Sequence, residues 1–161
     1  MNSQLMFFSN FLKNPKEVAA VVPSSRYVAK KVMQNIDFRD AKCIVEYGPG
    51  VGTITRPILK NLNPDARLIC FELNEKFYAL LSKDIRDKRF LVINDTAENI
   101  DLQSKKLGID SVDYVLSGIP FSLIEKENKK SIIKKTENIL RYGGKFIVYQ
   151  QYNLHLEKYL K

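Results

Sequence analysis

The stretch Glu46-Tyr47-Gly48-Pro49-Gly50-Val51-Gly52 decides how this chain of 161 residues folds. An apolar run over residues 41–46 leads into it and predicts a strand, and residues 53–62 after it have the pattern of a helix. Glycines allow the tight turn between the two and let a ligand approach the backbone without a Cβ atom in the way. The helix that follows would point its N-terminus at that ligand. We therefore expect a strand, a ligand-binding turn and a helix at this point.

Strands and helices alternate from this turn to residue 150. We predict four further strands at residues 67–72, 90–94, 112–116 and 145–150, and two further helices at 75–85 and 126–140. A loop rich in Asp, Ser and Lys is expected before the fourth strand, and Gly143 and Gly144 are expected to end the last helix. Apolar strands alternating with helices indicate a doubly wound parallel sheet covered on both faces. The predicted fold class is therefore α/β and Rossmann-like, in one domain spanning residues 1–161.

A helical N-terminal segment, residues 1–40, is expected ahead of a core at residues 41–150. Leu5, Phe8 and Leu12 share one helical face, and Ser24 or Ser25 can cap a later helix. The net charge is +4 over residues 1–42, −1 over residues 43–121 and +5 over residues 122–161. Because the basic charge lies on the two flanks, we expect an anionic partner surface, either phospholipid or nucleic acid, with a solvated basic face as the alternative.

Cysteine and histidine are scarce, which argues against one class of site. The chain has two cysteines, Cys43 and Cys70, and one histidine, His155, without a C-x-x-C pair. No Cys/His zinc site, and no other metal, is therefore expected. The apolar runs are shorter than the roughly 20 residues of a membrane-spanning helix, and no basic region precedes the first one, so neither a span nor a signal peptide is expected. This cysteine usage fits a reducing cytoplasm.

The spacing of the glycines separates two classes of cofactor. A dinucleotide turn, G-x-G-x-x-G, would need a glycine at position 53, which is Thr53. The observed E-x-G-x-G-x-G resembles the turn of class I S-adenosylmethionine-dependent methyltransferases, whose cofactor has no pyrophosphate. The expected cofactor is therefore S-adenosylmethionine, bound at Glu46, Tyr47, Gly48, Pro49, Gly50 and Gly52.

Two acids follow the next two strands. Glu72 ends the second strand, 20 residues after Gly52, and its carboxylate can accept hydrogen bonds from two ribose hydroxyls. Asp95 follows the third strand, where the resemblance to methyltransferases implies that it accepts from the adenine amino group; a loop cap is the alternative. The neighbouring residues assigned to the same cofactor site are Leu73, Asn74, Thr96 and Ala97.

The segment Ser117-Gly118-Ile119-Pro120-Phe121 ends the fourth strand. Ligands of this fold bind beyond the carboxyl ends of the strands. We therefore expect catalytic residues at Ser117, Gly118, Ile119 and Pro120, facing the transferring methyl, with Ser117 also touching the cofactor; an ordinary Gly-Pro turn is the alternative. The reaction would be an in-line displacement by a neutral amine. The sequence identifies no general base, although Tyr27, Tyr47 and Tyr149 are candidates.

Four stretches together resemble the bacterial phospholipid N-methyltransferases, the family that methylates phosphatidylethanolamine. They are Phe11-Leu12-Lys13-Asn14-Pro15, Val18-Ala19-Ala20-Val21-Val22-Pro23-Ser24-Ser25, Val45-Glu46-Tyr47-Gly48-Pro49-Gly50 and Ser117-Gly118-Ile119-Pro120-Phe121. The resemblance implies methylation of a phosphatidylethanolamine-type amine, Ser24 and Ser25 beside the cofactor, and a cytoplasmic protein held peripherally on the inner face of the membrane by its N-terminal helix. Arg26, Lys30 and Lys31 would then reach the headgroup phosphate, with a solvated helix face as the alternative.

The resemblance is incomplete at the C-terminal end. A class I methyltransferase sheet carries two further strands after the fifth, whereas residues 151–161 read as the start of a helix. We therefore expect a five-stranded sheet that lacks the last two strands.

The rival family is the ribosomal RNA adenine N6-methyltransferases, which share the glycine turn and both acids. Their segment after the fourth strand is typically Asn-hydrophobic-Pro-aromatic, and the Asn side chain accepts from the target amine. Ser117 and Gly118 do not supply that amide. A small-molecule or protein amine is a further alternative acceptor. The non-enzymatic hypothesis is a module that only binds a membrane or a partner, which cofactor binding in solution would test.

Overall fold

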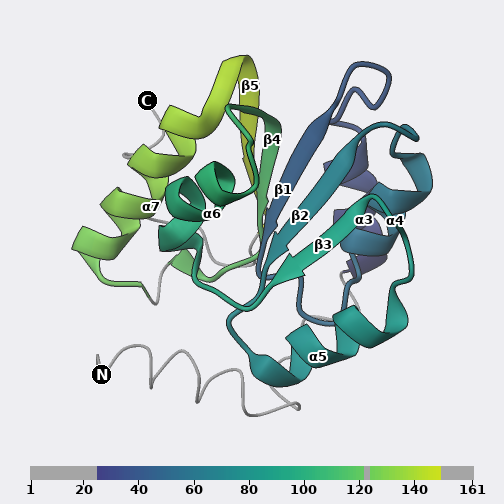
Figure 1. Ribbon diagram of the computed structural model, residues 1–161, viewed down its shortest axis with the longest axis horizontal. Coiled ribbons are helices and arrows are strands. Elements are labelled where there is room, and N and C mark those ends of the chain that lie inside the picture. The colour runs from purple at the N-terminus through teal and green to yellow at the C-terminus, as the bar shows by residue number, and fades with distance from the viewer. Residues whose placement is uncertain (1–24, 122–123, 150–161) are drawn as a thin grey trace.

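The computed structural model describes residues 25–121 and 124–149, in which strands and helices alternate (Figure 1). The helices predicted within residues 1–22, the cap at Ser24 and the helix predicted over residues 151–161 lie outside the described residues. The elements are α3 Ser25–Met33, β1 Cys43–Tyr47, α4 Thr55–Asn61, β2 Arg67–Phe71, α5 Glu75–Asp84, β3 Phe90–Ile93, the 3-10 helix η1 Ala97–Asn99, α6 Ile100–Lys106, β4 Val112–Ser117, α7 Lys126–Ile139 and β5 Leu140–Val148.

The strands of the described sheet run parallel in the order β3-β2-β1-β4-β5. The chain moves outward from β1 to β3 and then crosses to β4 and β5, so its direction reverses between β1 and β4. In doubly wound sheets a ligand binds at such a reversal, beyond the carboxyl ends of the strands. Here those ends are Tyr47 and Ser117, which are partners in the register of β1 and β4. The predicted doubly wound α/β fold is confirmed, and the described residues contain five strands.

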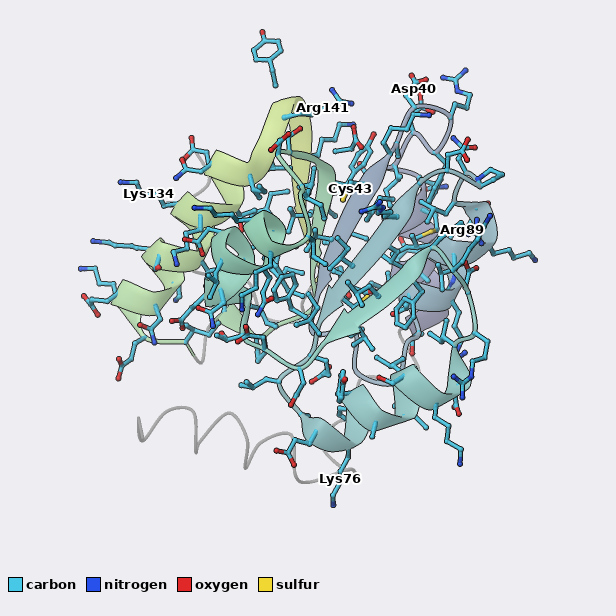
Figure 2. The ribbon with its side chains drawn as sticks, viewed as in Figure 1. Asp40, Cys43, Lys76, Arg89, Lys134 and Arg141 are labelled. Atoms are coloured by element: carbon cyan, nitrogen blue, oxygen red, sulfur yellow. The ribbon has the colours of Figure 1, made fainter. Side chains whose placement is uncertain are left out.

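Helices cover both faces of the sheet, with α3, α4 and α5 on one face and α6 and α7 on the other (Figure 1). Side chains of β1 alternate between the two cores, so that Ile44 packs on the α3–α5 side and Tyr47 on the α6–α7 side. Cys43 is buried, whereas Lys76 of α5 and Lys134 of α7 extend from the surface (Figure 2). Burial on both faces explains why β1, β2 and β4 read as continuous apolar runs.

Helix α3 has the apolar face expected from the sequence. Ala29 and Val32 are buried, and Val28 and Met33 pack against the same core. None of the helices in the described residues is long and apolar enough to cross a membrane.

Two predictions near the fourth and fifth strands are wrong. Part of the expected polar loop forms η1 and α6, because Ile100 and Ser104 are buried while Asp101 and Leu102 between them are exposed. The fifth strand begins at Leu140 rather than at residue 145, so the glycine pair at 143 and 144 lies inside the strand instead of before it. A register shift opposite this pair, ahead of the Tyr114 and Lys145 partners, accommodates the two glycines.

Candidate functional site

The glycine turn leaves β1 at the carboxyl edge of the sheet and continues to α4. Gly48 donates its N–H to the carbonyl of Phe71 at 2.9 Å, which fixes the start of the turn to the end of β2. Gly50 has a φ of 57°, and a Cβ added there would meet no atom of the described residues within 4 Å. Helix α4 begins at Thr55, two residues later than predicted, because the turn extends through residue 54. The turn therefore offers backbone next to open space, as the expected methionine and ribose portions require.

Glu72 lies directly after β2 and faces this turn. Its side chain is buried, and its two oxygens accept the N–H groups of Gly50 at 2.9 Å and Asn74 at 2.8 Å. Burial raises the pKa of Glu72, and the N–H groups of Asn74, Gly50 and Leu73 oppose that rise. Asn74 also caps α5, since its side-chain oxygen accepts the N–H groups of the first turn. The predicted ribose acid thus lies beside Gly50, where a carboxylate could bind a ligand hydroxyl.

Asp95 follows β3, and protein donors already occupy both of its carboxylate oxygens. One oxygen accepts from the backbone of Thr96 and the side chain of Asn99, each at 2.8 Å, and the other accepts from Gln103 at 2.6 Å. Burial acts to raise the pKa of Asp95, but these three hydrogen bonds outweigh it and lower the pKa. Thr96 caps η1, and Ala97 is buried in the core. Asp95 therefore has the contacts of a loop cap, and its adenine role stays a prediction.

Glu46, the last-but-one residue of β1, is fully buried beneath the turn. Its carboxylate accepts hydrogen bonds from Thr55 at 2.7 Å, Tyr149 at 2.9 Å and the Cys70 thiol at 3.5 Å. Burial raises the pKa of Glu46 to about 6; the three donors oppose that rise, and the nearby charge of Glu72 adds to it. Through these hydrogen bonds Glu46 connects β1 to α4, to β2 and to the residue after β5.

Sequence reasoning did not find Thr55 or Cys70 as members of this cluster. Thr55 follows Glu46 by nine residues, on the other side of the turn. Whether its hydroxyl reaches the Glu46 carboxylate depends on where α4 begins, which the sequence placed two residues too early. Cys70 is the register partner of Glu46 in the parallel pair β1–β2. The contact between Cys70 and Glu46 follows from this register, which is known only once the two strands are aligned in the sheet.

The segment of residues 117–121, here named the acceptor segment after its predicted role, packs directly against the glycine turn. Gly118 donates its N–H to the Tyr47 carbonyl at 2.9 Å, and a Cβ added to Gly48 would lie 2.8 Å from Ile119. The hydroxyl oxygen of Ser117 is buried and has no hydrogen-bond partner among the described residues. Phe121 is fully buried and packs edge-on to Phe146, with ring centroids 6.2 Å apart. The structure therefore brings the two predicted motifs together, and Phe121 anchors the acceptor segment in the core.

The three tyrosines proposed as bases lie in different surroundings. Tyr47 is a core residue whose hydroxyl hydrogen-bonds Thr136 at 2.9 Å, and burial raises its pKa. Burial and the adjacent Glu46 charge raise the pKa of Tyr149 well above its ordinary value. Both shifts favour the protonated phenol, and the base roles of Tyr47 and Tyr149 stay predictions. Tyr27 is 68% exposed on α3, with the Lys31 ammonium 5.8 Å from its ring centroid, and its catalytic role stays a prediction.

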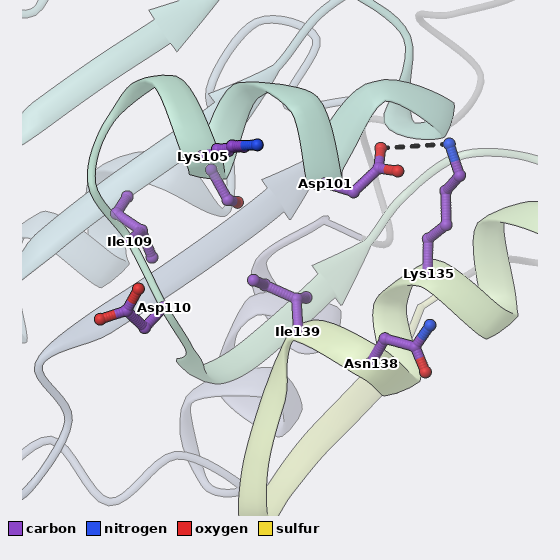
Figure 3. A pocket seen from close by; sticks show the side chains of 8 residues that line it. Asp101, Lys105, Ile109, Asp110, Lys135, Asn138 and Ile139 are labelled. Carbon is purple, nitrogen blue, oxygen red and sulfur yellow. Dashed lines mark hydrogen bonds and ion pairs between the residues drawn. The ribbon is translucent and has the colours of Figure 1, made fainter.

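A surface pocket lies between α6 and α7, away from this site (Figure 3). Asp110, which precedes β4, and Ile139, which precedes β5, both line it, so it lies toward the amino ends of these strands. Lys135 and Asp101 at its rim pair with each other at 3.1 Å. Within residues 25–121 and 124–149, no group of three His, Cys, Asp or Glu side chains is placed to hold a metal ion.

Comparison with known proteins gives one family and two kinds of relative. The family described as ribosomal RNA adenine dimethylase matches residues 2–111. The ornithine lipid N-methyltransferase of Singulisphaera acidiphila is 28% identical over 147 residues, which are 91% of this chain and 77% of that protein. The ribosomal RNA small subunit methyltransferase A of Ureaplasma parvum is 27% identical over 143 residues, which are 80% of this chain and 50% of that protein. The chain thus spans about half the length of the ribosomal RNA enzyme.

Solved structures share the fold at low identity. The plantazolicin methyltransferase BpumL, in complex with SAH, superposes with a TM-score of 0.66 at 16% identity, covering 92% of this chain and 58% of that one. The mitomycin 7-O-methyltransferase MmcR gives 0.65 at 18% identity, covering 89% and 42%. At these identities the likeness concerns the fold alone.

Proposed function

The chain belongs to the ribosomal RNA adenine dimethylase family and is an S-adenosylmethionine-dependent methyltransferase, and from that premise we propose that it methylates the primary amine of a membrane lipid. The bound cofactor supplies a methyl group on a sulfonium, which the lone pair of an amine displaces. We assign Glu72 to the ribose hydroxyls, Asp95 to the adenine end, and the backbone at Gly50 to the opening through which the cofactor approaches.

One observation carries the choice of acceptor, and it lies in the acceptor segment. Gly118 has no side chain, and a Cβ added there would lie 2.9 Å from the ring of Tyr149. Position 118 therefore lacks the Asn side chain that is typical of the RNA enzymes, and the ring of Tyr149 leaves no room for one. An alkyl amine needs no planar recognition of that kind, which favours a lipid headgroup. The ornithine lipid relative, matched over 91% of this chain, supports the same class of acceptor.

The amine must be neutral when it attacks, because an ammonium has no lone pair. Burial raises the pKa of both Tyr47 and Tyr149, which favours their protonated forms and makes them poor bases at neutral pH. We infer that the amine loses its proton to solvent at the edge of the site. An alkyl amine has a pKa near 10, as lysine does at about 10.4, so the rate should rise with pH through the neutral range.

Membrane contact is the second part of the proposal. Basic charge concentrates in residues 1–42 and 122–161, and Lys126, Lys130 and Lys134 follow one another at intervals of four along an exposed face of α7. Each basic residue near an anionic bilayer contributes about 1 kcal/mol of binding. We propose peripheral association, tested by sedimentation with anionic and neutral vesicles. A chain starting at Asn14 that binds anionic vesicles as well as the full chain would remove residues 1–13 from this role.

The test of the acceptor uses the full chain and labelled S-adenosylmethionine. Vesicles containing phosphatidylethanolamine, vesicles containing ornithine lipid and unmethylated ribosomal RNA are offered separately, and label is counted in each. We expect label in at least one lipid and none in the RNA. Label in RNA alone would replace the proposal with ribosomal RNA methylation, the candidate that the family match favours. No binding of the cofactor and no transfer to any acceptor would favour the non-enzymatic module.

A further inference from the structure

Tyr149 follows β5 and is attached to the acceptor segment by both its backbone and its ring. Its N–H donates to the carbonyl of Ser117 at 3.0 Å. Its ring lies over Gly118, since a Cβ added to that glycine would come within 2.9 Å of a ring carbon and 3.0 Å of the hydroxyl oxygen. The ring therefore fills the space that any side chain at position 118 would occupy.

The hydroxyl of Tyr149 reaches the other half of the site. It donates to Glu46 at 2.9 Å, directly below the glycine turn. The turn and the acceptor segment also touch each other, because Gly118 bonds the Tyr47 carbonyl and Ile119 packs on Gly48. One side chain thus contacts the strand that carries the cofactor turn and the segment that faces the methyl group.

We propose that Tyr149 is a positioning residue that holds the cofactor turn and the acceptor segment at the spacing that methyl transfer requires. This inference rests on the proposed function, since it assigns the acceptor side of the site to residues 117–121. In-line transfer needs the reacting atoms about 3–3.5 Å apart, and a misplacement of about 1 Å can cost 100-fold in rate. Tyr149 acts through Glu46 and Gly118 and does not take a proton.

The charge of Glu46 gives this role a signature beyond packing. The groups of the described residues that face its carboxyl are Thr55 from α4, Cys70 from β2, Tyr149, and the carboxylate of Glu72 after β2. Donation from Tyr149 favours the ionised form of Glu46, against the burial that disfavours it. Removing the hydroxyl should therefore move the titration of Glu46 to higher pH. Protonation would also remove the negative charge from the carboxyl to which Thr55, the first residue of α4, donates, and so weaken the bond that ties the end of the turn to β1.

The first experiment measures binding of S-adenosylhomocysteine by calorimetry between pH 5 and pH 8. It uses Tyr149→Phe, which keeps the ring, and Tyr142→Phe as a matched control, because Tyr142 is fully exposed on β5. We expect the affinity of the parent chain and of Tyr142→Phe to fall as the pH drops through about 6. The midpoint for Tyr149→Phe should lie at higher pH, with several-fold weaker binding at pH 6 and nearly equal binding at pH 8.

The second experiment is a double-mutant cycle between positions 118 and 149, read by kcat and KM on the acceptor of the parent chain. In the parent chain, Gly118→Ala should lower kcat at least tenfold with little change in the KM for the cofactor. In a chain that already carries Tyr149→Ala, adding Gly118→Ala should lower kcat much less. Equal harm from Gly118→Ala in both backgrounds, or a Tyr149→Phe titration identical to that of Tyr142→Phe, would overturn the proposal. Failure of the lipid assignment would show as the wrong acceptor and would leave the binding titration unchanged, so the two failures are distinguishable.

Discussion

Replacement of Glu72 by glutamine tests the cofactor site most directly. The two carboxylate oxygens accept backbone N–H groups from Gly50 on one side and Asn74 on the other. A glutamine amide has one acceptor oxygen and one NH₂ group. Whichever way the amide turns, one of the two N–H groups faces another donor, so the turn or the cap of α5 loses its partner.

The magnitude follows from the number of hydrogen bonds lost. A hydrogen bond to a charged group contributes about 1.5–3 kcal/mol, and each 1.4 kcal/mol is a factor of ten in affinity. Loss of one such bond to the turn or to a ribose hydroxyl should therefore weaken cofactor binding by about 10- to 150-fold. The fold should persist, because the five strands and both cores lie outside this contact.

The assay is calorimetric titration of Glu72→Gln with S-adenosylmethionine at pH 7.5. Glu75→Gln serves as the control, because Glu75 is an exposed carboxylate three residues away in the first turn of α5. The control should bind nearly as the parent chain does. If Glu72→Gln also binds within twofold of the parent, Glu72 does not hold the cofactor and the assignment of its carboxylate is refuted.

Three further outcomes are expected. Burial raises the pKa of Glu46 from 4.5 to about 6, so the contribution of Glu46 to the free energy of unfolding is fully present below pH 4.5 and falls by about 2 kcal/mol as the pH rises through about 6. Urea unfolding at several pH values should show this fall in the parent chain and not in Glu46→Gln; the same pH dependence in both proteins would contradict it. Gly48→Ala should lower the melting temperature more than Gly108→Ala, since both residues have positive φ but only the Cβ at position 48 would press on the acceptor segment, at 2.8 Å; equal shifts would show that the contact is unimportant. Tyr47→Phe should cost about 1–3 kcal/mol by leaving the buried Thr136 hydroxyl unpaired, and adding Thr136→Val should recover part of this in thermal unfolding.

The sequence predicted those strands and helices whose own residues form a clear apolar pattern. The strands β1, β2 and β4 were predicted because both of their faces are buried, which makes them continuous apolar runs. Helix α6 was missed because only Ile100 and Ser104 of its seven residues are buried, so its composition reads as a loop. The start of the fifth strand was misplaced because two adjacent glycines usually end an element, whereas here the strand continues through them at a register shift.

The sequence also predicted part of the candidate site. The glycine spacing and the acid at position 72 follow a pattern within one chain segment, and the structure brings both to the carboxyl edge of the sheet beside Gly50. The surroundings of Tyr47 and Tyr149 could not be predicted, because a tyrosine at a strand end can point into either core and the pattern does not say which. Tyr47 points into the α6–α7 core, and Tyr149 points beneath the turn.

By itself the sequence determined the order of strands and helices along the chain and the glycine turn, because each depends on residues close together in the chain. It also determined the family, because each motif of the resemblance lies within one short stretch. Only the tertiary structure decided that Glu46 meets Thr55, Cys70 and Tyr149, and that Tyr149 fills the space over Gly118. Position 149 is separated from position 46 by 103 residues. Their contact depends on β4 lying between β1 and β5, and strand order in a parallel sheet is set by how the helices cross over it, which no local pattern records.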